Sequence, residues 1–381
     1  MTSTKAETRA GHSGGSTRLP SRSRAPAITQ VEGRHVTIRI ETKSGEFELA
    51  GISNENILFS GLSKGLTLPY ECATGTCGTC RARVMSGTVD IVWDAAPGFA
   101  RLKRDKGDIL MCQAHAPGDC VLRIPSDVCI SERPRPRQFS GEITKTRLLT
   151  HDVVHFDVAL DARMPFDAGQ FVVLAVPGMA GGRAYSMVNY APETDRLSFV
   201  AKKKPGGGFS QWMFGGAVQG SRIKVFGAVG KATFRPAVEA NDLVIVAGGS
   251  GIAGMMSILD CAIAAGHFER HRGRVYFGVR TLADGFYLSE LSRFSFAAKG
   301  ALTISLVLSH ENPQRDTHPE FPEIRLDTGF VHEAAARSLE GGAETALGFV
   351  AGPPPMVEGA IRVLLKDARI PARSIRYDKF G

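Results

Sequence analysis

The chain has 381 residues, is 43% hydrophobic and carries a formal net charge of +8. It has neither an apolar run near the ~20 residues of a membrane-spanning helix nor an apolar leader, so we expect a cytoplasmic protein without a membrane anchor. Most of the excess positive charge lies in residues 1–34 and 131–137 rather than on a folded region, which argues against nucleic-acid binding.

The first 33 residues differ in composition from the rest of the chain. They are rich in Ser, Arg, Gly and Thr and show no hydrophobic period, so residues 1–33 are predicted to form a disordered basic tail. Their composition vaguely suggests a transit peptide, but a solvated extension is the favoured interpretation.

The first folded domain is expected at residues 34–130. Alternating apolar residues on both sides of Lys43-Ser44-Gly45 predict a pair of strands, and residues 56–63 predict a short helix. A cysteine-rich segment follows, and a further strand is expected at residues 121–124. This order predicts a small α+β domain.

The second domain is expected at residues 138–238, after a linker at 131–137. Alternating prolines and like charges in Ser-Glu-Arg-Pro-Arg-Pro-Arg should keep this linker extended. Short, evenly spaced apolar strands then follow, with a helix only near residues 209–214, and this pattern predicts an antiparallel β-barrel. The expected strands include 153–160, 171–176, 197–202 and 221–226.

The third domain, residues 239–381, has a different rhythm. Apolar strand-like runs are mostly separated by segments long enough for helices, which predicts an α/β domain with a parallel sheet and ligands at the carboxyl ends of its strands. Ile375 and Tyr377 alternate in a last run that should close the sheet. The other expected strands are 243–247, 274–278, 302–308 and 347–351.

Four of the seven cysteines form a C-x4-C-x2-C pattern with a fourth thiol further along the chain. The predicted metal ligands are Cys72, Cys77, Cys80 and Cys112. This is the spacing of plant-type [2Fe–2S] centres, and the small residues between the thiols leave backbone N–H groups free to reach sulfur. A zinc site would more often show paired C-x2-C motifs. The remaining thiols, which we expect to be structural, are Cys120, Cys129 and Cys261.

Two further motifs suggest a nucleotide cofactor. Arg183-Ala184-Tyr185-Ser186 ends a predicted strand, and Pro205-Gly206-Gly207-Gly208-Phe209-Ser210 precedes a predicted helix. An arginine and a helix N-terminus together could hold a pyrophosphate. In the third domain, Gly248 to Gly254 form a glycine-rich turn after a strand, which is typical of a dinucleotide site but does not match G-x-G-x-x-G.

With these motifs in this order, residues 34–381 resemble the ferredoxin–NAD(P)H reductase family. The closest likeness is to members with an N-terminal, β-grasp-like ferredoxin domain that serve as reductase components of bacterial soluble di-iron monooxygenases acting on methane, alkenes, toluene or phenols. The resemblance implies a monomer that carries a [2Fe–2S] cluster and FAD, takes electrons from NADH, and passes them to a terminal oxygenase or its ferredoxin.

The resemblance also implies roles for individual residues. Arg183 would contact the FAD pyrophosphate, Tyr185 would pack on the isoalloxazine, and Ser186, a catalytic residue, would bond near flavin N5. Many members have Cys where this chain has Ala351, and often Pro where it has Gly254. The implied cofactor-binding residues are Arg183, Tyr185, Ser186, Val200, Lys202, Gly207, Gly208, Ser210, Gly248, Gly249, Ser250, Gly251, Ile252, Arg280, Gly352 and Pro353.

Three questions stay open at this level. Arg280 follows the strand where members read the adenosine ribose; the surrounding sequence favours NADH, although Arg280 could pair with the 2′-phosphate of NADPH. Phe380 is expected to shield the flavin face and to take part in hydride transfer, unless the chain end is frayed. Alternatives for the acceptor are a Rieske dioxygenase or a non-oxygenase protein, and a pure electron carrier or a reductase of small molecules is also considered.

Overall fold

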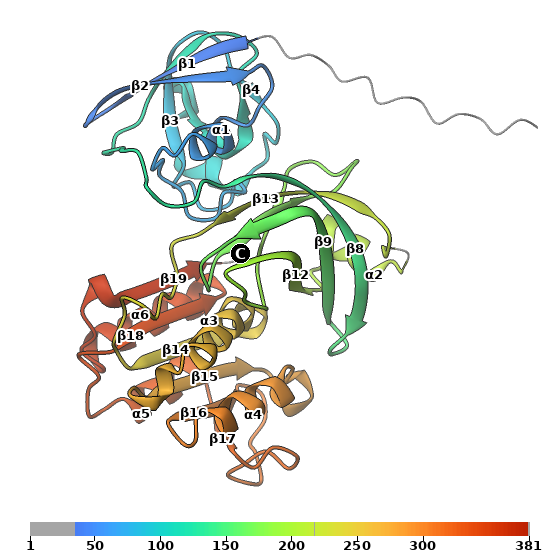
Figure 1. The fold of residues 1–381 in the computed structure, drawn as a ribbon, viewed down its shortest axis with the longest axis vertical. Helices are drawn as coiled ribbons and strands as arrows, with labels where there is room; N and C mark the ends of the chain where they lie inside the picture. The colour runs from blue at the N-terminus through green and yellow to red at the C-terminus, as the bar shows by residue number, and fades with distance from the viewer. Residues whose placement is uncertain (1–34, 217, 380–381) are drawn as a thin grey trace, which may run out of the picture. The chain divides into compact units, whose positions relative to one another are not determined.

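The computed structural model describes residues 35–216 and 218–379, all of which belong to one compact unit (Figure 1). The predicted tail, residues 1–33, and Phe380 lie outside the described residues. Three sheets of five or six strands divide the described chain into three domains in the order expected from the sequence. Among the described residues, no helix is long and apolar enough to cross a membrane.

The first domain is a mixed sheet in the order β2-β1-β7-β3-β5, covered by one short helix. The helix begins after Asn56, whose side-chain oxygen accepts a hydrogen bond from the backbone N–H of Phe59 (3.1 Å). The elements are β1 (His35–Thr42), β2 (Gly45–Ile52), α1 (Ile57–Ser63), β3 (Arg81–Ser86), β4 (Asp90–Ile91), η1 (Pro97–Arg101), η2 (Arg104–Lys106), β5 (Asp108–Leu110), η3 (Met111–Gln113), β6 (Ala114–His115) and β7 (Cys120–Arg123).

The second domain is an antiparallel sheet of six strands in the order β11-β10-β13-β8-β9-β12. Alternate residues of β9 are buried, as the period of a strand requires. A hydrogen bond from Val188 N to Ser198 O (2.8 Å) joins the chain after β11 to β12 and gives the sheet its barrel-like form. The elements are β8 (Arg137–Leu148), β9 (Val153–Pro165), β10 (Phe171–Ala175), β11 (Arg183–Ser186), β12 (Glu193–Lys202), α2 (Gly208–Phe214) and β13 (Arg222–Val229).

The third domain is an all-parallel sheet in the order β17-β16-β15-β14-β18-β19. Its elements are β14 (Leu243–Gly248), η4 (Gly249–Gly251), α3 (Ile252–Ala264), η5 (His267–Glu269), β15 (Gly273–Val279), η6 (Leu282–Asp284), α4 (Leu288–Ala297), β16 (Leu302–Leu308), β17 (Ile324–Thr328), α5 (Val331–Ser338), β18 (Leu347–Gly352), α6 (Pro354–Lys366), η7 (Ala372–Ser374) and β19 (Ile375–Lys379).

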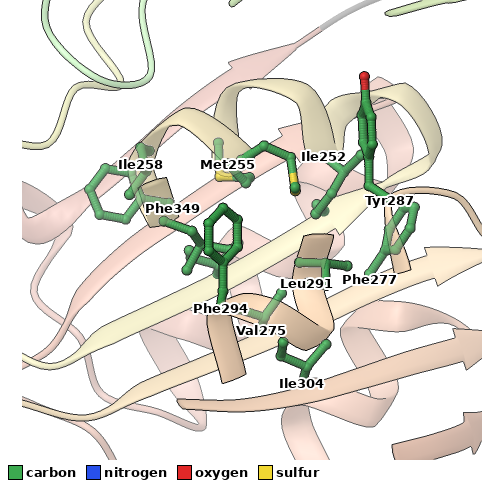
Figure 2. Close-up of a cluster of buried hydrophobic side chains, with 14 of the residues drawn as sticks. Ile252, Met255, Ile258, Val275, Phe277, Tyr287, Leu291, Phe294, Ile304 and Phe349 are labelled. Atoms are coloured by element: carbon green, nitrogen blue, oxygen red, sulfur yellow. The ribbon is translucent and has the colours of Figure 1, made fainter. Parts of the chain in front are cut away.

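Helices cover both faces of this parallel sheet. On one face α3 and α4 bury their apolar residues, and Figure 2 shows Met255 of α3 and Leu291 of α4 in one apolar cluster with Phe277 of β15. On the other face α5 and α6 pack against Val244 and Val246 of β14. Tyr287 lies at the edge of the first cluster with its hydroxyl pointing out of it (Figure 2). Because both faces are covered, the exposed features of the domain concentrate at the ends of the strands.

The short helices and the closing strand agree with the sequence-based expectations. The helix expected at 56–63 is α1, the one near 209–214 is α2, and the last apolar run is β19, parallel to β18. Several strands were not anticipated. In the first domain these are the short strands β3, β4, β5 and β6. In the third domain it is β17, which is short and buries only its first residue, Ile324. With so little apolar pattern, the segment gives no strand signal.

Candidate functional site

The four predicted metal ligands come together at one end of the first domain as two pairs of thiols. Cys72 and Cys77 share hydrogen bonds within the loop between α1 and β3, including Cys77 N to Cys72 Sγ (3.4 Å). Cys80 ends that loop, and its Sγ lies 3.1 Å from the Sγ of Cys112 in η3. The loop therefore supplies three thiols and the turn after β5 supplies the fourth.

This arrangement fits a two-iron cluster better than a single ion. A tetrahedral zinc site would hold four sulfurs about 3.8 Å apart, all around one centre. Among the described residues, the only group of three or more potential ligand atoms within 4.8 Å of one another is His151, Asp152 and Asp284. Since the four thiols do not gather around one point, their pairing matches a centre in which each metal takes two protein ligands.

The loop between the thiols presents its backbone to sulfur. The N–H of Thr74 donates to Cys72 Sγ (3.5 Å), and that of Thr79 donates to Cys77 Sγ (3.5 Å). Gly75 and Gly78 have φ values of +89° and +84°, which an L side chain rarely adopts. A side chain on Gly98 of η1 would meet Gly75 O at 2.7 Å, so η1 must pack closely over the loop.

The thiols differ in proton affinity. The pKa of Cys72 is lowered to about 5, mainly because the Cys77 thiol donates a hydrogen bond to it, while that bond raises the pKa of Cys77. Thiols bind metal as thiolates, so a metal would displace the shared protons. Outside this group, Cys120 and Cys261 are buried and Cys129 is exposed, consistent with structural roles for the first two.

The predicted flavin motif lies on β11. Arg183 donates to the carbonyl of Gly182 (2.9 Å), and its guanidinium carbon lies 5.2 Å from the centre of the Trp93 ring in the first domain. Tyr185 packs against Phe209 of α2 at 4.8 Å between ring centres, and burial raises its pKa. Ser186 is buried, and its hydroxyl has no hydrogen-bond partner within the described chain. An orphaned hydroxyl of this kind suits a bound group with a polar atom beside it.

The glycine-rich loop before α2 is held in shape by its own serine. Ser210 Oγ accepts a hydrogen bond from Lys204 N (3.0 Å) and donates to Gly207 O (2.9 Å). Gly207 is the N-cap of α2, and Gly208 is its first residue. The hydroxyl of Ser210 is therefore used in hydrogen bonds within the loop. The groups of the loop that could face a phosphate are the backbone groups of Gly207 and Gly208 at the start of α2.

The predicted dinucleotide residues line a cavity of about 660 Å³ at the carboxyl ends of the parallel strands. Gly248 and Ser250 lie after β14, Arg280 after β15, and Gly352 and Pro353 after β18. Parallel sheets place their ligand sites at this edge. The predicted residues that line the cavity are Lys202, Gly248, Gly249, Ser250, Arg280, Gly352 and Pro353.

Three predicted residues lie away from this cavity. A side chain on Gly251 would clash with the carbonyl of Ala351, so this glycine allows close packing of η4 against β18. Ile252 begins α3 and is fully buried, and Val200 of β12 is buried in the same apolar cluster. We infer that these buried residues support the cavity walls without contacting a ligand directly.

The cavity also has walls that the sequence did not indicate. Phe330 is 59% exposed and stacks on His332 (5.8 Å between ring centres), and the Nδ1 of His332 is buried without a partner in the described chain. Asp284 and Glu333 add carboxylates to the lining. Phe330, His332 and Glu333 follow the unanticipated strand β17, and Asp284 precedes α4. The only sequence feature that could have pointed to this part of the cavity is Gly329, at the turn before α5.

Three contacts link the first domain to the second close to the thiol loop. The hydroxyl of Tyr70 accepts a hydrogen bond from Gly230 N (3.0 Å), and Phe59 of α1 stacks on Phe226 of β13 at 4.0 Å between ring centres. Lys231 Nζ lies 5.4 Å from the centre of the Tyr70 ring. Tyr70 stands two positions before Cys72, so the loop is anchored where it begins.

Three models of known domain families match the chain. The 2Fe-2S iron-sulfur cluster binding domain matches residues 41–117, the oxidoreductase FAD-binding domain matches 140–234, and the oxidoreductase NAD-binding domain matches 245–362. Each matched range lies inside one of the domains expected from the sequence.

Whole proteins are similar over most of the chain. The ferredoxin–NAD(+) reductase component of the alkene monooxygenase system of Xanthobacter autotrophicus (strain ATCC BAA-1158 / Py2) is 33% identical over 86% of this chain and 96% of its own. The reductase component of phenol 2-monooxygenase from Pseudomonas sp. (strain CF600) is 29% identical over 86% and 89%. The solved structure of the ferredoxin reductase in carbazole 1,9a-dioxygenase has a TM-score of 0.75 and 28% identity, covering 91% of this chain and 99% of that one.

Proposed function

The chain belongs to the family of ferredoxin–NAD(P)+ reductases that join a [2Fe–2S] domain to FAD- and NAD-binding domains, and from this premise we propose that it supplies electrons to the oxygenase of a multicomponent hydrocarbon monooxygenase. The observation that carries the proposal is the paired arrangement of Cys72 with Cys77 and of Cys80 with Cys112, ahead of complete flavin and dinucleotide domains. An electron carrier alone would need neither of these two domains.

The cofactors supply the redox chemistry: a flavin accepts two electrons from a nicotinamide, and a two-iron cluster passes them on singly. The residues of this chain bind and orient these groups. Arg183 and the start of α2 would hold the pyrophosphate of FAD, with Tyr185 against its ring system. The buried hydroxyl of Ser186 would provide the hydrogen bond beside the reacting edge of the ring.

We propose NADH as the physiological donor. Asp284 and Glu333 line the cavity together with Arg280, so their carboxylates would oppose the extra phosphate of NADPH. Lys202, a possible counter-charge, is already paired with Asp152 (3.1 Å). A kcat/KM that is higher for NADPH than for NADH would contradict this proposal.

The role of Phe380 in hydride transfer remains a proposal. The domain bounds, which are 34–130, 138–238 and 239–381, are likewise proposed. In the described chain β19 ends at Lys379 beside β18, whose last residue, Gly352, lines the dinucleotide cavity. From the family resemblance we propose that Phe380 controls access of the nicotinamide to the flavin. Exchange of Phe380 for Ala should change the rate or nucleotide dependence of flavin reduction while both cofactors stay bound.

The test is an anaerobic titration of the purified holoprotein with NADH, followed by optical and EPR spectroscopy. FAD accepts two electrons and the cluster accepts one, so complete reduction should take about 1.5 equivalents of NADH per chain. Release of FMN instead of FAD, or a capacity of about one equivalent without an iron–sulfur EPR signal, would overturn the proposal.

The identity of the acceptor needs a separate measurement. One similar solved structure is named as the ferredoxin reductase of a carbazole dioxygenase, so a ferredoxin of a ring-hydroxylating dioxygenase is the second candidate. A purified di-iron oxygenase and a purified ferredoxin of a ring-hydroxylating dioxygenase, chosen from the products of the neighbouring genes where these encode them, can be mixed with the NADH-reduced holoprotein. We expect rapid oxidation of its cluster by a di-iron oxygenase; faster oxidation by a ferredoxin would favour the second candidate.

A further inference from the structure

The charge of the first domain is divided unevenly. Residues 35–130 contain ten Lys or Arg and eleven Asp or Glu, so the domain as a whole is close to neutral. Six of the ten basic residues fall within 81–106, together with only three acidic residues. The remainder of the domain holds four basic and eight acidic residues. The segment that follows the third thiol is therefore basic within an otherwise acidic domain.

The part of this segment formed by η1 and Arg101 lies against the thiol loop. The guanidinium of Arg101 donates to the carbonyl of Cys77 (2.8 Å), and the preceding η1 is bonded to the loop through Gly98 N and Gly75 O (2.8 Å). Lys103 and Lys106 follow directly in the chain. We call the exposed basic residues of this region, among which Asp105 is also exposed, the basic rim: Arg81, Arg101, Lys103, Arg104 and Lys106.

Most of the rim charge is not neutralised inside the domain. Arg104 is paired with Asp94 (2.7 Å), but both side chains are about half exposed or more, at 49% and 72%. In the described chain no salt bridge is found for Arg81, Arg101, Lys103 or Lys106, whereas Arg83, outside the rim, is paired with the buried Asp108. A surface of this kind leaves its positive field available to a partner.

We propose that the basic rim is the surface on which the electron-accepting protein docks, and that the acceptor presents an acidic face to it. The inference deepens the proposed function, on which it rests. Cys77 is partly exposed and Thr79 is exposed, so a protein seated on the rim would face the open edge of the thiol loop. Complementary charge on the acceptor would speed its encounter with that edge, most strongly at low ionic strength.

The experiment measures electron transfer from the NADH-reduced holoprotein to two purified probes of opposite charge. The soluble haem domain of cytochrome b5 is the acidic acceptor, and horse cytochrome c is the basic one. Second-order rates are followed by stopped flow over a range of ionic strength, and each is divided by the rate at which NADH reduces the cluster in the same protein. The test variant is Lys103→Glu/Lys106→Glu; both lysines are exposed, and their side chains make no salt bridge within the described chain.

A matched control changes the domain charge equally outside the rim. Arg39 and Lys43 are exposed on β1 and in the turn after it, so Arg39→Glu/Lys43→Glu removes the same number of positive charges. We expect the wild-type rate with the acidic acceptor to fall as salt rises. At low salt the rim variant should be slower by about tenfold with that acceptor and faster with the basic one. The control variant should behave nearly as the wild type does.

Equal effects of the two double variants would overturn the proposal, because they would reflect net charge rather than a docking surface. A wild-type rate with the acidic acceptor that does not depend on salt would also overturn it. So would binding of the rim to heparin without faster transfer to the acidic acceptor, which would indicate a general polyanion surface. If NADH does not reduce the cluster, the proposed electron-transfer function fails instead; if the cluster is reduced but passes no electrons to the acidic acceptor, the docking proposal fails.

Discussion

Cys112 supplies the one predicted cluster ligand that lies outside the thiol loop. Its Sγ lies 3.1 Å from that of Cys80, and both thiols are buried. Because each iron needs two protein thiolates, Cys112→Ala should abolish the iron–sulfur spectrum and EPR signal while NADH still bleaches the flavin. Cys120→Ala and Cys261→Ala are the controls and should keep wild-type iron content. Wild-type iron in Cys112→Ala would exclude this residue as a ligand.

Exchange of Ser186 should have different effects on the apoprotein and on the FAD-loaded protein. A buried hydroxyl without a partner costs about 1–3 kcal/mol, so Ser186→Ala should leave the apoprotein as stable as wild type or more stable. With FAD bound, loss of the hydrogen bond should slow flavin reduction by NADH by about tenfold. Thermal unfolding of the apoprotein and stopped-flow reduction of the holoprotein measure the two effects.

Ser257 is the matched control for this change. It is also buried, but its hydroxyl accepts from Gly169 N (2.8 Å) and donates to Gly254 O (2.9 Å). Ser257→Ala should therefore lower the unfolding temperature of the apoprotein, which Ser186→Ala should not. A destabilised Ser186→Ala apoprotein would show that the hydroxyl has a structural partner after all.

His267 should make the stability of the third domain depend on pH. Its Nε2–H donates to Asn241 O (2.9 Å), but burial outweighs this bond and lowers its pKa. The unfolded chain takes up a proton near pH 6.5 while the folded chain holds the imidazole neutral, so the free energy of unfolding falls as the pH drops below that value. Urea unfolding at about pH 7.5 and about pH 5.5 should show a smaller loss for His267→Gln. Equal losses would exclude His267 as a cause.

At the scale of residues, spacing carried more information than identity. The thiols were predictable because a cluster restricts the distances between its ligands along the chain. The wall formed by Phe330 and His332 was not, since a lone aromatic next to a histidine has no characteristic spacing. Ser210 was predicted to complete a phosphate site, and its bonds to Lys204 and Gly207 could not be read from the sequence.

At the scale of elements, one arginine of β19 joins this strand to the segment that precedes β14. Arg376 bonds to Thr233 O and to the carboxylate of Glu239, and its guanidinium lies 5.7 Å from the centre of the Phe349 ring. Glu239 is only 10% exposed at its side chain, so Arg376→Ala would leave a largely buried carboxylate without its partner. We expect a loss of about 3 kcal/mol in the free energy of unfolding, measured with urea.

Two further variants separate this ion pair from a general effect of lost arginine. Arg373 is exposed in η7, and Arg373→Ala should change stability by less than about 0.5 kcal/mol. In Arg376→Ala/Glu239→Gln the unpaired charge is gone, so part of the lost stability should return. No recovery in the double variant would mean that the cost arises from packing on Phe349.

Element prediction succeeded where burial imposes a period. The strands β14, β15, β16 and β18 read as apolar runs because helices cover both faces of their sheet. β17 lies at the edge of the sheet and buries only Ile324, so the physical cause of the signal is missing there. β9 and β12 extend beyond the predicted ranges through residues that are largely exposed.

At the scale of the whole molecule, the order of the three domains follows from motifs, but their contacts do not. Tyr70 and Gly230 are 160 residues apart, and neither belongs to a motif. The stack of Phe59 on Phe226 likewise joins ordinary core-type residues of two domains. Contacts of this kind depend on surface shape, which a sequence pattern of period two or 3.6 does not encode.

Tyr70 leads to the last prediction, which concerns electron transfer between domains. Its hydroxyl accepts from Gly230 N (3.0 Å), and Tyr70→Phe would leave that buried N–H unpaired at a cost of about 1–3 kcal/mol. The thiol loop begins two residues later, so a weaker anchor should reduce the fraction of molecules in which the cluster is held against the flavin domain. NADH should reduce the flavin at the wild-type rate, while transfer from flavin to cluster slows by about tenfold.

Stopped-flow spectroscopy separates these steps because the flavin and the cluster absorb differently. Tyr276→Phe is the control: its hydroxyl donates to Ser338 Oγ (2.6 Å) within the third domain, so that variant loses a comparable hydrogen bond away from the thiol loop. Its flavin-to-cluster rate should match the wild type. If Tyr70→Phe also matches it, the bond to Gly230 does not control the approach of the two centres, and other contacts between the two domains, such as the stack of Phe59 on Phe226 and the contact of Arg183 with Trp93, would have to hold them together.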